Sequence, residues 1–178
     1  MKTTIIRTNI SNKIGMGHLF RMKNFAKELS KESEVIFVLD KDEEIIRKII
    51  NFRSFFLYKK NEKFFSQSDD AIRLKKIIYN IKIDLLVIDD YRLNNIWENF
   101  FYKKMPVVVF DDTNTRIHKC DLLVDSKWEG KLTIKRYKKL VPTSTIKLLG
   151  PKYSIINIVK KKKKSNKFNN VLFYLGGA

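Results

Sequence analysis

Two continuous apolar runs constrain the fold of this chain more than any other feature. Residues 85–88 (Leu-Leu-Val-Ile) and 107–110 (Val-Val-Val-Phe) contain no polar residue. Such runs suit strands that are buried on both faces of a parallel sheet. Further strand candidates, at 4–6, 34–39, 55–58, 122–124 and 146–149, are separated by helical patterns. This alternation predicts a doubly wound, parallel α/β sheet of the Rossmann-like class.

Apolar residues at helical spacing predict four helices between these strands. The first carries Leu19, Met22, Phe25, Ala26 and Leu29; the second follows the capping residues Asp40 and Asp42 and ends near Asn51; the third opens at Ser68 and Asp69; the fourth is capped by Asn94 and turns Trp97, Phe100 and Phe101 inward. In a sheet of this kind ligands bind beyond the carboxyl ends of the strands, so the polar residues there are the candidates for a site.

The first strand leads into a loop, Gly15-Met16-Gly17-His18, that runs into the first helix. Glycines let the backbone turn tightly and approach a ligand closely. The start of a helix offers free N–H groups and a partial positive charge, which suit a phosphate. Imidazolium is disfavoured there, so a neutral His18 is able to accept a proton. The alternative is that the glycines only make a turn and that His18 caps the helix.

Arg21 follows His18 by one helical turn and lies on the same face. A cation in the first turn opposes the helix dipole, so we expect a carboxylate or phosphate to bind Arg21. The fourth strand ends in Asp89-Asp90-Tyr91. For Asp89 we favour helix capping or turn formation over pairing with an arginine or orienting a sugar. Tyr91 suits a pocket lining and a structural role equally well.

The fifth strand ends in Asp111-Asp112, and His118 follows. Capping or turn formation is the favoured role for Asp111 as well. His118 is expected to be a surface or structural residue rather than a second base. Vicinal carboxylates can bind Mg²⁺, but no phosphate-loop lysine motif accompanies them, so we expect no metal and no cofactor.

Composition narrows the class of protein. The chain has 178 residues, of which 44% are hydrophobic, which is enough for one domain with a sizeable core. The single cysteine, Cys120, excludes a disulfide within one chain. No signal-peptide pattern and no apolar run of membrane-spanning length is present, so we expect a soluble, cytoplasmic protein without a membrane partner.

The net charge of +18 raises the alternative of nucleic-acid or membrane-surface binding. The lysines are scattered through the chain, and only residues 160–164 form a run. A composition bias spread over solvated faces is therefore the favoured interpretation, and we expect no specific nucleic-acid partner.

Several segments, in the same order along the chain, resemble one enzyme family. Ile14-Gly15-Met16-Gly17-His18 with Arg21, Ile88-Asp89-Asp90-Tyr91, Asp111-Asp112 with His118-Lys119-Cys120-Asp121, and Leu149-Gly150-Pro151 carry the likeness. They resemble the UDP-2,4-diacetamido-2,4,6-trideoxy-β-L-altropyranose hydrolases of pseudaminic acid biosynthesis, whose relatives include spore-coat polysaccharide biosynthesis proteins. This chain departs from that family at Asn9, where the family usually has an acidic residue.

The resemblance implies a glycosyltransferase-B-like architecture of two Rossmann-like domains with the active site between them. Residues 1–157 are then the first domain, 158–170 a lysine-rich linker, and 171–178 the first strand of a truncated, nucleotide-binding second domain. It further implies that His18 activates water at the anomeric carbon of the UDP-sugar. Arg7, Gly15, Gly17, Arg21 and Tyr91 are implied to order the loop or bind the substrate.

In this family the second domain supplies most of the uridine and diphosphate contacts. We therefore expect the 178-residue chain alone to be inactive. Three alternatives stay open: a nucleotide-sugar glycosyltransferase, a non-catalytic binding module or remnant, and a basic nucleic-acid binder.

Overall fold

The computed structural model describes residues 1–9, 16–64 and 66–156. Its core is one seven-stranded sheet in the order β3-β2-β1-β4-β5-β6-β7, and every neighbouring pair of strands is parallel. The strands are β1 (Lys2–Thr8), β2 (Ser33–Leu39), β3 (Arg53–Phe56), β4 (Leu85–Asp89), β5 (Val107–Phe110), β6 (Leu122–Asp125) and β7 (Ile146–Leu149). The predicted α/β, Rossmann-like fold class is confirmed.

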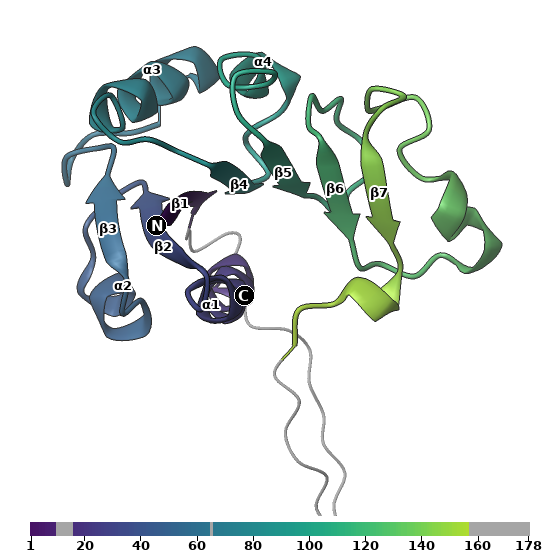
Figure 1. Cartoon of the computed structure of the whole chain (residues 1–178), viewed down its shortest axis with the longest axis horizontal. Helices are drawn as coiled ribbons and strands as arrows, with labels where there is room; N and C mark the ends of the chain where they lie inside the picture. Colours follow the sequence, from purple (N-terminus) through teal and green to yellow (C-terminus); the bar gives the residue numbers. More distant parts are fainter. Residues whose placement is uncertain (10–15, 65, 157–178) are drawn as a thin grey trace, which may run out of the picture.

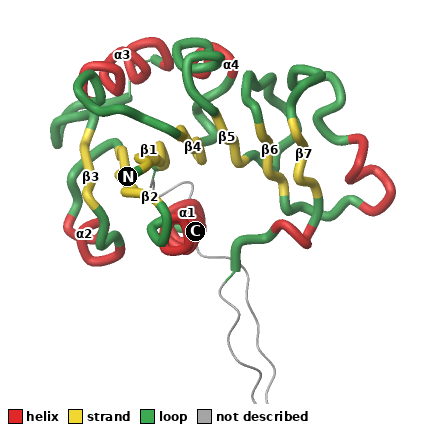
Figure 2. Tube along the Cα trace, in the orientation of Figure 1, coloured by secondary structure: helices red, strands yellow, loops and turns green. Residues whose placement is uncertain are grey.

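Helices cover both faces of the sheet, as Figures 1 and 2 show. The helices are α1 (Gly17–Leu29), α2 (Glu44–Ile49), α3 (Gln67–Ile77) and α4 (Asn95–Glu98), with 3₁₀ helices η1 (Gly130–Lys135) and η2 (Pro151–Tyr153). On one face α3 and α4 pack Leu74 and Trp97 against the sheet. On the other face α1 and α2 pack Met22 and Ile46 against it.

Side chains alternate between these two cores along each central strand, as the pleat requires. In β1, Ile5 joins the α3–α4 core and Ile6 joins the α1–α2 core. In β4, Ile88 joins the α3–α4 core and Val87 the α1–α2 core. This alternation decides which polar residue at each strand end faces which helix.

Three predicted boundaries differ from the structure. Strand β3 ends at Phe56. The N–H groups of Leu57 and Tyr58 still donate to the carbonyls of Leu39, which ends β2, and of Asp40, the residue after it. Helix α2 starts after Glu43 without a side-chain cap. The Oγ of Ser66 accepts the N–H of Asp69, so α3 begins slightly earlier than predicted.

The predicted Asn94 cap of α4 is confirmed, since its side chain accepts the N–H of Ile96 at 2.9 Å. Within the described residues, no helix is long and apolar enough to span a membrane. The predicted linker at 158–170 and the strand at 171–178 lie outside these residues, as does Gly15.

Candidate functional site

The candidate site lies where the strand order reverses. From β1 the chain builds outward through β2 and β3, whereas β4 and its successors lie on the other side of β1. The carboxyl ends of β1 and β4 therefore diverge into separate loops, which is the usual ligand position in open α/β sheets. Helix α1, which starts at Gly17, is the next element after β1 along the chain, and Asp89 ends β4.

His18 and Tyr91 meet at this edge of the sheet. Their ring centroids are 4.4 Å apart with the planes at 88°, an edge-to-face contact. Each residue follows an apolar strand in the sequence, and the carboxyl ends of parallel strands share one edge, so the expected position of both at strand carboxyl ends is confirmed. The imidazole of His18 therefore packs against the ring of Tyr91.

Asp89 fixes the orientation of His18. The Nδ1 atom of His18 lies 2.5 Å from Oδ1 of Asp89, and the Asp89 side chain is fully buried. The Nη2 of Arg21 also lies 3.3 Å from this Nδ1, but it donates to Asp89 at the shorter distance of 2.6 Å. Because a carboxylate can only accept, the short contact with Asp89 places a proton on Nδ1, and in the neutral ring the lone pair is then on Nε2. Within the described residues Nε2 has no hydrogen-bond partner, and the side chain keeps 8% of its surface exposed.

The capping role favoured for Asp89 is wrong. Its carboxylate binds two side chains, His18 and Arg21, and caps no helix in the described part of the chain. The pleat explains this: Asp89 follows Val87 by two residues and so faces α1, the helix that carries both partners. That alternation was the sequence signal that identifies Asp89 as a site residue.

The carboxylate partner predicted for Arg21 is confirmed. Arg21 Nε donates to Asp89 Oδ2 at 2.9 Å and Nη2 donates to Oδ1 at 2.6 Å, a two-bonded pairing. Burial alone would lower the pKa of Arg21, but Asp89 and the nearby Asp112 raise it above its ordinary value. Arg21 is therefore a permanent cation that keeps Asp89 in place.

Asp112, predicted only as part of the Asp111-Asp112 strand end, is a site residue in the structure. Its Oδ1 accepts the hydroxyl of Tyr91, and its Oδ2 lies 3.7 Å from Nη1 of Arg21. Burial and Asp112 both raise the pKa of Tyr91, so the hydroxyl stays protonated. With 33% of its side chain exposed, Asp112 is the carboxylate of this group that reaches solvent.

Arg7 is placed differently from the substrate contact predicted for it. It is fully buried and pairs with Asp70, at 2.6 Å and 3.1 Å, and with Asp40 at 2.6 Å. By the same alternation Arg7 lies on the face of Ile5, toward α3 and away from α1. Its role in this geometry is to hold β1, β2 and α3 together.

Gly17 is the first residue of α1 and has no structural need to be glycine. Its φ is not positive, and a Cβ built on it meets no described atom within 4 Å. Met16 precedes it without a side-chain cap, and the first turn contains no acidic residue. The first N–H groups of this turn have no acceptor within the helix or elsewhere in the described part of the chain, which is the arrangement that suits an anion.

His118 belongs to a second, buried cluster and is structural, as predicted, but not on the surface. Its Nδ1 lies 2.6 Å from Oε1 of Glu98, and its Nε2 lies 3.4 Å from Asp111. Asp111 binds Thr113 in its own turn, as predicted, and also pairs with Arg116. Arg116 lies over the ring of Tyr91 at 5.4 Å, so this cluster supports the site from behind.

The described residues contain no cluster of side chains suited to a metal ion. No group of three or more His, Cys, Asp or Glu side chains that could hold a metal ion occurs among residues 1–9, 16–64 and 66–156. The expected absence of a metal thus stays a prediction for the chain as a whole.

Comparisons with known proteins support the fold and leave the activity open. No protein-family model matches the chain. An uncharacterized protein of Methanocaldococcus jannaschii is 31% identical over 190 aligned positions, which cover all of this chain but only 37% of that protein. The chain therefore spans little more than a third of the relative it matches.

The crystal structure of MurG from Acinetobacter baumannii superposes on this chain with a TM-score of 0.52. The match covers 71% of this chain and 41% of MurG, at 10% identity. At that identity the likeness concerns the fold alone. It supports the glycosyltransferase-B-like class of Rossmann-like domains that the sequence predicted.

Proposed function

We propose that this chain forms the side of the active-site cleft that carries the catalytic base of a nucleotide-sugar hydrolase, with His18 as the general base. The observation that carries the proposal is the pairing of His18 Nδ1 with the buried Asp89. In the neutral ring this pairing places the lone pair on Nε2, at the carboxyl edge of the sheet. Nε2 lies beside the first turn of α1, whose first N–H groups have no acceptor among the described residues. By family resemblance the substrate is UDP-2,4-diacetamido-2,4,6-trideoxy-β-L-altrose.

The reaction needs one base. His18 Nε2 takes a proton from water while the water oxygen forms a bond to the anomeric carbon. The bond from that carbon to the β-phosphate oxygen breaks, and UDP leaves with the electron pair. A diphosphate is a good leaving group, so no second carboxylic acid is required, unlike the paired carboxylates of ordinary glycosidases. Asp89 stabilises the imidazolium that forms.

The remaining site residues have positioning roles in this proposal. Arg21 holds Asp89, and Tyr91 packs against the imidazole ring. Asp112, which reaches solvent, is suited to accept an amide N–H or hydroxyl of the sugar. The two acetamido groups of the proposed substrate offer such donors.

A nucleotide-sugar glycosyltransferase is the second candidate, favoured by the glycosyltransferase-B-like fold. The same base would then take its proton from an acceptor hydroxyl instead of water. A non-catalytic module would use the edge for binding only. These candidates differ in the product that they form.

The test is a UDP-release assay in water enriched in heavy oxygen, with the UDP-sugar as the only sugar present. The chain is assayed alone and joined to a second domain of the hydrolase family, after calorimetry has shown that the joined protein binds UDP. We expect the joined protein to release UDP and to place heavy oxygen on the free sugar, and the chain alone to stay near background. A joined protein that binds UDP but releases none without an added acceptor would contradict the hydrolase.

A further inference from the structure

Large apolar side chains are exposed at the β7 end of the sheet, away from the candidate site. Trp128 is 68% exposed, Leu132 61% and Ile134 78%. They line one groove together with lysines 131, 135 and 152, between η1 and the start of η2. We call these six residues the Trp128 surface. Single exposed apolar residues are ordinary, but a contiguous group of this kind marks an interaction surface.

Hydrogen bonds to buried residues fix the segment 128–136, which carries most of these side chains. The N–H of Glu129 donates to Thr133 Oγ1 at 2.8 Å, and Thr133 is buried. Arg136 Nε donates to the buried Asp125 at 2.5 Å, which fastens the end of η1 to the end of β6. The alternate residues are thereby forced outward, so the exposure of Leu132 and Ile134 is built into the loop.

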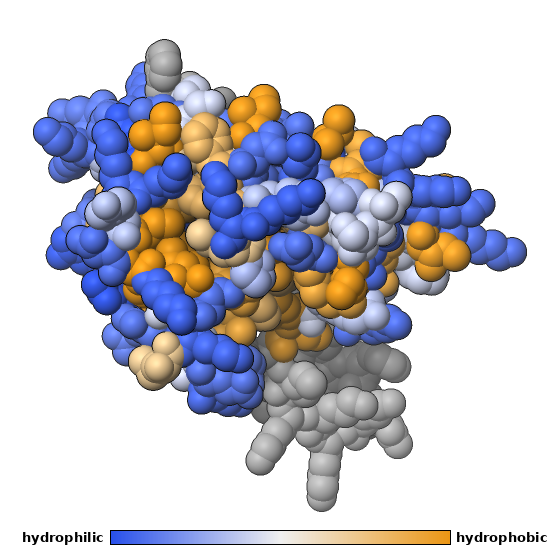
Figure 3. All heavy atoms as spheres, turned by 45° about the horizontal axis from the view of Figure 1, so that its top comes forward, coloured by the Kyte–Doolittle hydropathy of each residue, from blue (hydrophilic) through white to orange (hydrophobic). Residues whose placement is uncertain are grey.

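Positive charge surrounds the apolar side chains. Lys131 and Lys135 flank Leu132 and Ile134 in the sequence, and neither forms an ion pair with a described residue. The one acidic residue of the segment, Glu129, is already paired with Arg136 and Lys127. On the face drawn in Figure 3, an apolar spot lies among hydrophilic atoms at the end of the molecule that carries β7.

We propose that the Trp128 surface docks on an anionic membrane surface. Tryptophan and aliphatic side chains set among lysines are the pattern of segments that lie in the bilayer interface. Lysine stems can accompany the apolar groups while their ammonium groups stay at the phosphates. A second copy of the chain is disfavoured as the occupant, because each copy carries a net charge of +18.

Docking of this kind would keep the candidate site close to the membrane. Trp128 follows the carboxyl end of β6 along the chain, and His18, in α1, follows that of β1. Three strand spacings separate β1 from β6, which is about 14 Å. This contact lies at the surface of a bilayer and requires no membrane-spanning segment.

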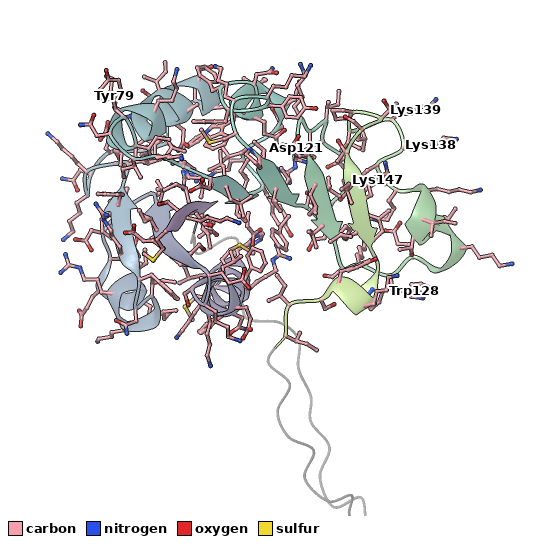
Figure 4. The ribbon with its side chains drawn as sticks, in the orientation of Figure 1. Tyr79, Asp121, Trp128, Lys138, Lys139 and Lys147 are labelled. Carbon is pink, nitrogen blue, oxygen red and sulfur yellow. The ribbon has the colours of Figure 1, made fainter. Side chains whose placement is uncertain are left out.

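The chain offers its own reporter and control. It has two tryptophans, and Trp97 is fully buried with its Nε1 bound to Asp70, so a change in emission on vesicle addition reports Trp128. Tyr79 is 85% exposed at the opposite end of the molecule, as Figure 4 shows. Tyr79→Ser with Lys75→Gln and Lys76→Gln is therefore a matched control that removes one exposed ring and two lysine charges elsewhere.

The experiment is sedimentation of the full chain with phosphatidylcholine vesicles, with and without phosphatidylglycerol, and quenching of Trp128 by brominated lipid. We expect binding to the anionic vesicles and quenching of Trp128. Trp128→Ser should weaken binding roughly tenfold, because one large apolar side chain is lost. The double variant Lys131→Gln with Lys135→Gln should weaken binding about 30-fold, since each lost charge weakens it about fivefold. The control variant should bind like the unmodified chain.

Two outcomes would overturn the proposal. The first is binding that does not depend on the Trp128 surface. The control variant would then lose as much sedimentation as the Trp128-surface variants, or brominated lipid would fail to quench Trp128. The other is no binding to anionic vesicles while an acidic protein surface, such as a polyglutamate-coated resin, retains the chain through Trp128. Because the substituted side chains are mostly exposed, unfolding of the variants is not expected, and circular dichroism checks this directly.

Discussion

His18 and Asp89 form the shortest link between the helix that starts after β1 and the end of β4, with Nδ1 and Oδ1 at 2.5 Å. Arg21, one turn along the same helix, binds the same carboxylate through two hydrogen bonds. A single buried carboxylate thus orients the imidazole and fastens the helix. The Nε2 atom, on the far side of the ring, is left to face away from Asp89.

This relationship predicts the tautomer of His18. In the unmodified chain the proton should reside on Nδ1. In Asp89→Asn, Arg21 retains the amide oxygen, so the amide N–H₂ faces Nδ1 and the ring proton moves to Nε2, which can then no longer act as a base. Nitrogen chemical shifts of the ring in NMR spectra distinguish the two tautomers.

The matched control for this prediction is Asp112→Asn. Asp112 contacts Tyr91 and Arg21 but not His18, so its substitution should leave the Nδ1 tautomer unchanged. An Nε2-protonated His18 in the unmodified chain would contradict the assignment.

Gly17 separates a ligand role from a structural role. In Gly17→Ala we expect the free energy of unfolding to stay constant or rise by a few tenths of a kcal/mol up to about 1, because alanine is the better helix former and meets no described atom. Binding of UDP-sugar should weaken, since the new methyl group stands where an anion approaches the first-turn N–H groups. Urea titration and calorimetry measure the two effects. A variant with weakened folding and normal binding would remove Gly17 from the site.

Arg7 should matter for stability. Arg7→Met leaves the buried Asp70 carboxylate with Tyr58 and Trp97 as its side-chain hydrogen-bond donors among the described residues. Breaking a buried pair in this way costs about 3–5 kcal/mol, which urea unfolding would record. The control is Arg47→Met, whose pairing with Asp42 is on the surface and should contribute little. Equal effects of the two substitutions would contradict the buried role of Arg7.

Because His118 is buried beside two carboxylates, we expect the free energy of unfolding to fall as pH rises. Burial alone would lower the pKa of His118, but Asp111 and Glu98 raise it above its ordinary value. The folded state therefore binds the proton more tightly than the unfolded state. The stabilisation is complete below about pH 6.5 and is lost as pH rises through the folded pKa, at no more than about 1.4 kcal/mol per pH unit.

Urea unfolding between about pH 6 and 8 measures this slope. His118→Gln should abolish it while lowering stability at the acid end of the range. A stability that rises with pH in the unmodified chain, or a slope that survives in His118→Gln, would show that another group is responsible.

The strands were predictable because their signal is local. Residues 85–88 and 107–110 are apolar throughout. In the structure the first run forms all of β4 except Asp89, and the second forms the whole of β5. The meeting of His18 and Tyr91 followed from topology, since both come after neighbouring parallel strands. Features of this kind depend on composition and order along the chain.

The roles of Asp89 and Arg7 were not predicted because they depend on the pleat. Asp89 and Asp90 look alike in sequence, yet only one of them faces α1. Arg7 lies on the other face of β1, where Asp70 is brought to it from α3 across 63 residues of chain. Reading the alternation outward from the apolar residues Val87 and Ile5 would have assigned both.

The central claim is that His18 is the base, and UDP release by the joined two-domain protein tests it most directly. We expect His18→Gln to lower the turnover rate by about 10²–10⁴-fold, the usual contribution of a general base, with the dissociation constant for UDP nearly unchanged. Tyr91→Phe, which keeps the ring beside the imidazole, should retain most of the activity. Turnover in His18→Gln equal to that of the unmodified protein would contradict the account.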